Sequence, residues 1–192
     1  MAAAAALGQT SDEQRFRDRL VDSEPSPAEI AEADLLCSIY GWRESESAYH
    51  AARSAGTPTG IIDKVLWGPT MVEAAARWGI EDDSNEERVA ALVERIGYAR
   101  GRALLAQAQG LRALRGGEHV KAEHLLFDAM QAFKTLDLDY ECTVATADHA
   151  RALAGHGRTD DAAAERADVR AYAERSGAKA LLGTVEPTPA AV

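Results

Sequence analysis

The sequence has few of the residues that build β-sheets. Its 192 residues include 40 alanines but only 10 valines and 6 isoleucines, and aromatic residues make up 6% of the chain. Alanine favours helices because it loses no side-chain entropy there, whereas β-branched and aromatic residues are enriched in strands. The composition therefore predicts an all-α protein, and the length allows one compact domain or one short repeat array.

Positive charge is also scarce. The chain carries 21 Lys and Arg against 31 Asp and Glu, a formal net charge of −10. This balance works against sequence-independent attraction to nucleic acids and anionic membranes. The single candidate for a basic stripe is interrupted by apolar positions, which is typical of a solvated helix face; it consists of Arg100, Arg102, Arg112 and Arg115. We therefore expect no nucleic-acid or membrane partner.

Cysteines and apolar runs are few. Cys37 and Cys142 are far apart in the chain, and the apolar segment Met1–Leu7 is too short for a signal peptide or a membrane span. These features predict a cytoplasmic protein with reduced thiols and no disulfide. We expect residues 1–25 to form a tail with a short helix and residues 183–192 to be a disordered tail.

Capping signals and the helical period divide the remaining chain into helices. Val89, Leu92, Val93 and Ile96 follow the i, i+3, i+4, i+7 pattern of one helix face, behind a capping box at Ser84. Gly68-Pro69 interrupts residues 56–79, where we expect one kinked helix or two short ones. The other predicted helices are Ser26–Tyr40, Arg43–Ala55, Tyr98–Arg115, Glu118–Leu136, Tyr140–Ala154 and Thr159–Arg175, the last capped by Thr159. Eight to ten helices joined by short turns should pack antiparallel.

Matching positions recur at a regular spacing in the C-terminal half of the chain. Gly117 and Gly157 are 40 positions apart, as are Ala122 and Ala162, and an aromatic near the helix end recurs after 39 positions, at Phe133 and Tyr172. A fixed period of roughly 20 to 50 residues is typical of solenoids. Over Ala103–Gly110, Gly117–Ala122 and Leu153–Ala162 the chain resembles the tetratricopeptide family of helical hairpin repeats. The likeness is to the longer-period arrays at the C-termini of bacterial regulators of the maltose-activator or LuxR type.

This resemblance implies an α-solenoid of antiparallel hairpins over residues 26–182, with a concave face that binds a protein or peptide segment. We therefore predict a non-enzymatic interaction or scaffold module, open to association into homo-oligomers through its terminal faces. The predicted partner-binding residues are polar positions on the inward helices, namely Gln107, Arg115, Asp148 and Arg151. Two alternatives stay open: a regulatory module that senses a small molecule between its hairpins, and a small all-α enzyme that uses His149 and neighbouring acids.

Motifs for nucleotide, nucleophile and zinc chemistry are missing. The sequence contains no GxxxxGK[ST], GxSxG, CxxC or HExxH. His149 and His156 are seven positions apart and could share a helix face, with Glu141, Cys142 and Asp148 nearby. No histidines are spaced i, i+4, however, and His156 lies between two glycines in a predicted turn. We therefore expect neither a metal nor a cofactor.

Overall fold

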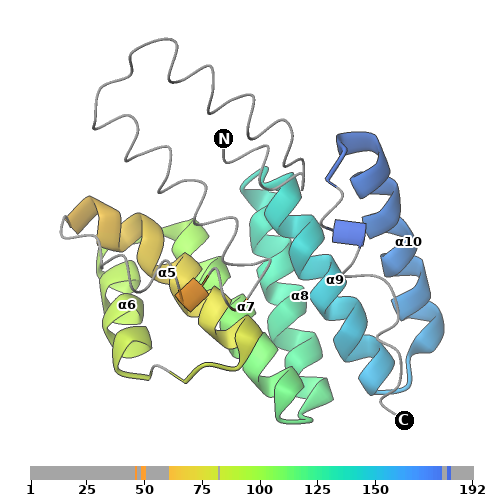
Figure 1. The fold of residues 1–192 in the computed structure, drawn as a ribbon, viewed down its shortest axis with the longest axis horizontal. Coiled ribbons are helices and arrows are strands. Elements are labelled where there is room, and N and C mark those ends of the chain that lie inside the picture. Colours follow the sequence, from red (N-terminus) through yellow and green to blue (C-terminus); the bar gives the residue numbers. More distant parts are fainter. Residues whose placement is uncertain (1–45, 47–48, 51–60, 82, 179–180, 183–192) are drawn as a thin grey trace.

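The computed structural model describes residues 46, 49–50, 61–81, 83–178 and 181–182 (Figure 1). In this part of the chain the secondary structure is helical and contains no strand, which confirms the all-α prediction. Its helices are α5 (Ile61–Trp78), α6 (Asp83–Ile96), α7 (Ala99–Arg115), α8 (His119–Thr135), α9 (Asp139–Gly155) and α10 (Thr159–Ser176). The helices predicted over Ser26–Tyr40 and Arg43–Ala55, and both predicted tails, lie wholly or mainly outside the described residues.

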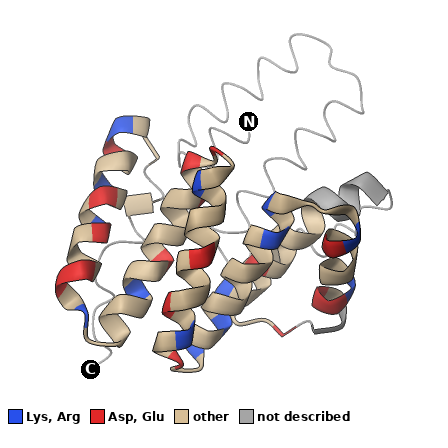
Figure 2. Ribbon diagram, turned by 180° about the vertical axis from the view of Figure 1, so that it is seen from behind, with Lys and Arg blue, Asp and Glu red and all other residues tan. Residues whose placement is uncertain are grey.

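Helices α7 to α10 run up and down side by side (Figures 1 and 2). Only three residues join each helix to the next, so successive helices must reverse direction. The predicted boundaries of these four helices agree with the structure to within one residue. Short turns and one-sided apolar patterns are therefore sufficient to locate them.

One turn geometry recurs along the chain. In it, the residue that closes a helix adopts a left-handed backbone conformation, with φ between 54° and 88°, at Gly97, Gly117, Asp137, Gly157 and Gly177. At the α7–α8 turn, the amide of Gly117 donates to Leu114 O (3.2 Å) and the amide of Glu118 donates to Ala113 O (2.9 Å). This pair of bonds is the Schellman motif, which satisfies carbonyls at a helix C-terminus. The same pair recurs at Tyr98, Leu138 and Arg158.

The even spacing of these turns defines a repeat of one helix and one turn. Gly79, after α5, is also left-handed but precedes Gly97 by only 18 positions. From Gly97 onward the left-handed residues stand at positions 97, 117, 137, 157 and 177. The residue four positions before each of them is apolar and at most 3% exposed, and these buried residues are Val93, Ala113, Phe133, Leu153 and Ala173. The register aligns Phe133 with Ala173, so the predicted pairing of Phe133 with Tyr172 is wrong by one position. Tyr172 is a half-buried neighbour of this position.

The predicted helix caps need correction. Arg158, not Thr159, occupies the N-cap position of α10, and its side chain makes no capping hydrogen bond. Helix α6 begins at Asp83, so Ser84 is already inside its first turn. The N-cap of α10 differs from the prediction because the turn is short, so that one residue bonds to both helices through its backbone. Arg158 donates its amide to Leu153 O of α9, and its carbonyl accepts the amide of Ala162 of α10.

Of the two alternatives predicted for residues 56–79, one kinked helix or two short ones, the structure has a single helix, α5, with Gly68-Pro69 inside it. A Cβ atom at Gly68 would come within 2.9 Å of Val89 on α6, and one at Gly101 on α7 would come within 3.2 Å of Pro69 Cγ. The dipeptide therefore marks the place where α5 approaches both α6 and α7. Pro69 has no amide to give to the carbonyl one turn earlier, and this packing offsets the loss.

The helices fall into two sets around this packing. The odd-numbered helices contact one another, α5 with α7 and α7 with α9, while α8 packs on α7 and α9, and α10 packs on α9. One core cluster joins Leu104 of α7, Phe133 of α8 and Ala145 of α9. Gly110 of α7 lies against Leu126 of α8, where a Cβ would come within 2.6 Å of Leu126 Cγ. A residue without a side chain thus allows α7 and α8 to approach closely at this point.

The turn geometry predicts unequal effects at two adjacent glycines. Gly117 has φ of 75° with open space where a Cβ would lie, so Gly117→Ala should lower the free energy of unfolding by about 1 kcal/mol through backbone strain alone. Gly116 has φ of −73° and is the matched control, because Gly116→Ala should change stability by less than about 0.5 kcal/mol. Urea unfolding measures both, and equal effects would contradict the role assigned to the left-handed residue.

Candidate functional site

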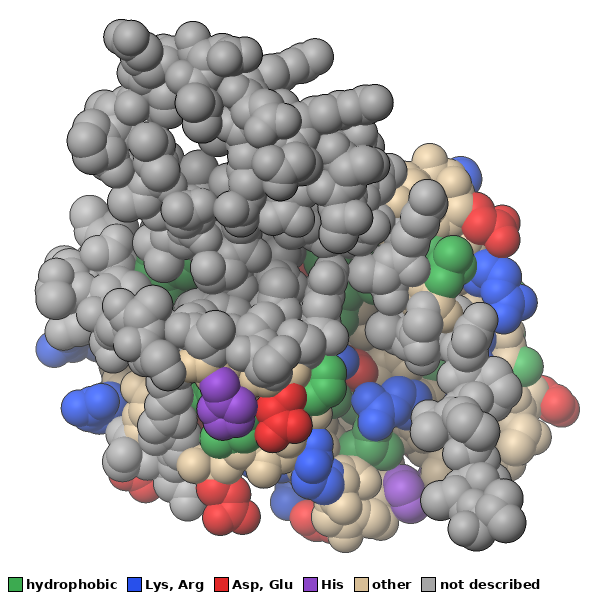
Figure 3. All heavy atoms as spheres, viewed as in Figure 1, with side chains coloured by type: hydrophobic (Ala, Val, Ile, Leu, Met, Phe, Trp, Pro, Cys, Tyr) green, Lys and Arg blue, Asp and Glu red, His purple; other side chains and the backbone are tan. Residues whose placement is uncertain are grey.

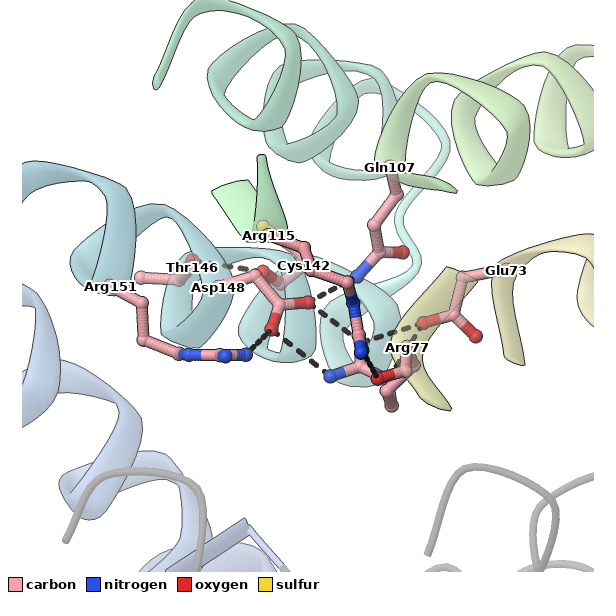
Figure 4. A network of polar contacts seen from close by, with 8 residues as sticks. All are labelled: Glu73, Arg77, Gln107, Arg115, Cys142, Thr146, Asp148 and Arg151. Carbon is pink, nitrogen blue, oxygen red and sulfur yellow. Dashed lines mark hydrogen bonds and ion pairs between the residues drawn. The ribbon is translucent and has the colours of Figure 1, made fainter. Parts of the chain in front are cut away.

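A buried polar network joins the three odd-numbered helices α5, α7 and α9 (Figure 4). Its centre is Arg77, in the last turn of α5, whose guanidinium lies 2.6 Å from a Glu73 oxygen and 2.7 Å from Asp148 Oδ2 of α9. The side chains of Glu73, Asp148 and Arg77 are only 0%, 3% and 12% exposed. The ion pair between Arg77 and Asp148 therefore links α5 to α9 away from water.

The residues predicted to bind a partner all belong to this network. Asp148 Oδ2 accepts a hydrogen bond from Gln107 Nε2 of α7 at 3.0 Å, and Asp148 Oδ1 accepts a long one from Arg151 Nη1 at 3.4 Å. Arg115 Nη2 of α7 donates to the backbone carbonyl of Arg77 at 2.8 Å. The four residues chosen from the sequence thus converge in space (Figure 4).

Two members of the network, Glu73 and Arg77, are absent from the predicted set. They stand four positions apart on α5, the spacing of a helical ion pair, and Arg77 Nε donates to Glu73 Oε1 at 3.0 Å. The i, i+4 spacing of Glu73 and Arg77 can be read from the sequence, but Gly68-Pro69 makes a regular helix hard to predict in this segment. The position of the pair opposite Asp148 depends on tertiary packing and has no sequence signature.

Burial separates the predicted residues into two kinds. Gln107 and Asp148 are 0% and 2% exposed, and their side chains bond to each other inside the protein. The second polar atom of Gln107, Oε1, has no partner among the described residues. Arg115 and Arg151 are exposed, and the Arg151 side chain is 52% exposed. Of these four residues, the two arginines can reach another molecule without rearrangement of the core.

The charges in the network stabilise one another. Burial by itself would raise the pKa of Asp148, but the guanidinium groups of Arg77 and Arg151 and the hydrogen bonds from Arg77 and Gln107 hold it below its ordinary value. Burial would likewise lower the pKa of Arg77, yet the carboxylates of Asp148 and Glu73 raise it. Both groups are therefore charged in the folded protein near neutral pH.

The arginines of the candidate basic stripe have acidic or carbonyl partners. Arg100 Nη2 of α7 donates to Glu141 Oε1 of α9 at 3.0 Å, a second link between odd-numbered helices. Arg112 pairs with Glu86 of α6, and Arg102 lies 3.7 Å from Glu94. Together with Arg115, these residues connect neighbouring helices and do not form one free basic face. On the one face that Figure 3 shows, the coloured side chains include charges of both signs.

The residues weighed as metal ligands lie apart. Glu141 and Asp148 face α7 and α5, whereas His149 Nδ1 contacts Glu165 of α10 and His156 Nδ1 lies 3.2 Å from Glu123 of α8. Burial raises the pKa of the Cys142 thiol, which disfavours the thiolate that binds metals. Among the described residues, no three or more His, Cys, Asp or Glu side chains are grouped to hold a metal ion.

A groove lies between α8 and α10, with α9 as its floor. It has a volume of about 710 Å³ and is lined by Glu123, His124, Phe127, Asp128, His149, Leu153, Arg158, Asp161, Ala164 and Glu165. Arg158 closes it at one end by pairing with Glu123 of α8 and with Asp161 of α10. The groove includes His149, which the sequence offered as a possible enzyme residue.

None of the helices described by the structure has the length and apolar character needed to cross a membrane. Comparison of the chain with protein-family models, with curated proteins and with solved structures finds no match. The resemblance to tetratricopeptide repeats therefore stays a prediction that depends on the residues quoted for it.

The buried ion pair predicts a large stability loss when it is broken. Asp148→Ala leaves the Arg77 guanidinium buried, with Glu73 as its one remaining counter-charge among the described residues, and should lower the free energy of unfolding by about 3 kcal/mol. Asp128→Ala, which removes an exposed carboxylate from α8, is the control and should cost less than about 0.5 kcal/mol. A small effect of Asp148→Ala in urea unfolding would show that the network contributes little to stability.

The lowered pKa of Asp148 also predicts a pH dependence. A carboxyl whose folded pKa lies below its unfolded value of about 3.9 stabilises the protein fully above that pH and loses its contribution as the pH falls through the folded pKa. The stability difference between wild type and Asp148→Asn should therefore shrink below about pH 4. Urea unfolding at a series of pH values from neutral to acidic measures this difference. A difference that stays constant with pH would contradict the lowered pKa of Asp148.

Proposed function

We propose that the protein is a non-enzymatic interaction module, a short α-solenoid whose odd-numbered helices contact a protein or peptide segment. The observation that carries this proposal is the regular repeat of helix and left-handed turn at positions 97, 117, 137, 157 and 177. A hairpin of two such helices cannot bury its apolar face alone, so neighbours stack on it and build an extended surface. Surfaces of this kind serve recognition in repeat proteins.

The helix contacts support a curved stack with the odd-numbered helices inside. These helices touch one another directly, α5 with α7 and α7 with α9, and the pairs Arg77–Asp148 and Arg100–Glu141 hold them at a fixed separation. On the other side, α8 and α10 stand apart with a groove between them. Closer spacing on one side of a stack bends it toward that side, which makes the odd-numbered side concave.

Exposed guanidinium groups on this side supply a recognition chemistry. Within the described part of the chain, Arg151 makes one long contact, of 3.4 Å to Asp148, and about half of its side chain is exposed, so most of its five N–H donors are available there. Arg115, an exposed residue of α7, adds a second guanidinium, whose Nη2 donates to the Arg77 carbonyl. Carboxylates are the natural partners of such groups, so the contacted segment should carry Asp or Glu. Beneath them, Gln107 and Asp148 hold the two helices in register.

Site-specific photo-cross-linking tests this proposal. A photoreactive phenylalanine analogue replaces Arg151 in the full chain, and a matched variant carries it at Glu87, which is exposed on α6. After irradiation in an extract of the native source, we expect a discrete protein adduct with the Arg151 position and none with the Glu87 position. Adding an excess of unmodified protein should abolish the adduct.

Circular dichroism and thermal melting serve to show that both variants fold like the wild type. An adduct pattern that is the same at positions 151 and 87, or no adduct at position 151, would reject the odd-numbered side as the partner surface.

A further inference from the structure

The groove between α8 and α10 has the composition of a binding site for a cation. Its walls and floor carry four carboxylates, on Glu123, Asp128, Asp161 and Glu165, against one guanidinium, on Arg158. That guanidinium is already engaged by Glu123 and Asp161. The groove therefore keeps a surplus of negative charge after its internal pairs are counted.

A buried histidine adds an acceptor to the floor of this groove. The His149 side chain is only 7% exposed, and its Nδ1 lies 2.8 and 2.9 Å from the two oxygens of Glu165. A carboxylate only accepts hydrogen bonds, so the proton of the neutral ring belongs on Nδ1 and the lone pair on Nε2. Nε2 has no partner among the described residues, and the ring lines the groove.

An aromatic ring stands beside this acceptor. Phe127 of α8 is 45% exposed, which is unusual for so large an apolar side chain, and its ring centre lies 5.8 Å from that of His149. The face of an aromatic ring attracts an ammonium or guanidinium group placed over it. Leu153, which is 1% exposed, closes the floor of the groove from below. Acceptors, negative charge and a π face thus share one cavity.

We propose that this groove binds a lysine or arginine side chain of a partner peptide. The alkyl stem of that side chain lies on the exposed ring of Phe127, and its charged nitrogen donates to His149 Nε2 and to the surrounding carboxylates. The volume of about 710 Å³ is in the range of pockets that hold a small organic group, which a basic side chain with one flanking residue matches.

This site extends the interaction role proposed above, but it does not include the odd-numbered side on which Arg115 and Arg151 lie. His149 and Arg151 are two positions apart on α9, and residues at that spacing point to different sides of a helix. The groove is therefore separate from the arginines of the odd-numbered side. The two proposals can be rejected separately, because the cross-linking position and the groove variants are different residues.

Fluorescence anisotropy with the full chain tests the groove directly. The probe is a labelled Ala-Leu-Lys-Leu-Ala peptide, compared with peptides in which norleucine or Glu replaces the Lys. We expect saturable binding of the Lys peptide, about tenfold tighter than that of the norleucine peptide, and none of the Glu peptide. Nα-acetyl-lysine amide should compete only weakly, which distinguishes a peptide site from one for a free amine.

Three variants connect the binding to the groove. Phe127→Leu removes the aromatic ring, and Glu165→Gln removes one negative charge while keeping an acceptor for His149 Nδ1. Each substitution should lower the affinity for the Lys peptide about fivefold or more. Glu174→Gln is the matched control, because it removes one negative charge from an exposed position of α10 that does not line the groove. Its affinity should stay within about twofold of wild type.

Thermal melting of every variant separates lost binding from lost folding. Equal binding of the Lys and norleucine peptides would overturn the proposal. Binding of Nα-acetyl-lysine amide as tight as that of the Lys peptide would overturn a peptide as the occupant of the groove. An equal loss in Glu174→Gln and Glu165→Gln would also overturn it, because binding would then follow net charge and not the groove.

Discussion

The structure depends on a backbone constraint: from α6 onward, each helix ends and the next begins within three residues. A left-handed residue makes this possible, because it turns the chain while its amide and the following amide close the last carbonyls of the helix. The next residue then starts the new helix without a side-chain cap. Helix lengths and turn positions follow from this constraint, and so does the position of each buried residue four places before the turn.

Buried charge then gives the two sides of the helix layer different properties. On the odd-numbered side, Arg77 reaches past α7 to Asp148, and such an ion pair fixes geometry more than it adds stability, because both groups must be desolvated. On the other side, the floor of the groove holds His149 against Glu165 of α10. A single helix, α9, supplies both features from adjacent positions, Asp148 and His149.

The sequence is informative where local chemistry decides the outcome. Glycines and apolar periodicity locate α7 to α10, and Asp137 belongs to a turn because Asp, like Gly, tolerates the left-handed conformation. Gly68-Pro69 is misleading because its role is to let α5 approach Val89 and Gly101, which only packing reveals. For the same reason Gln107 and Asp148 can be recognised as inward polar residues, but the ion pair of Asp148 with Arg77, 71 positions away, cannot.

The regular spacing of the turns also limits how such a chain can grow or shrink. Gain or loss of two helices with their turns would return every later helix to the side it occupied before. Gain or loss of a single helix would exchange the sides, so that the positions of Arg77 and Asp148 would no longer share a face. Viable changes of length by duplication or deletion should therefore preserve parity, which makes the helix pair the unit of inheritance in this architecture.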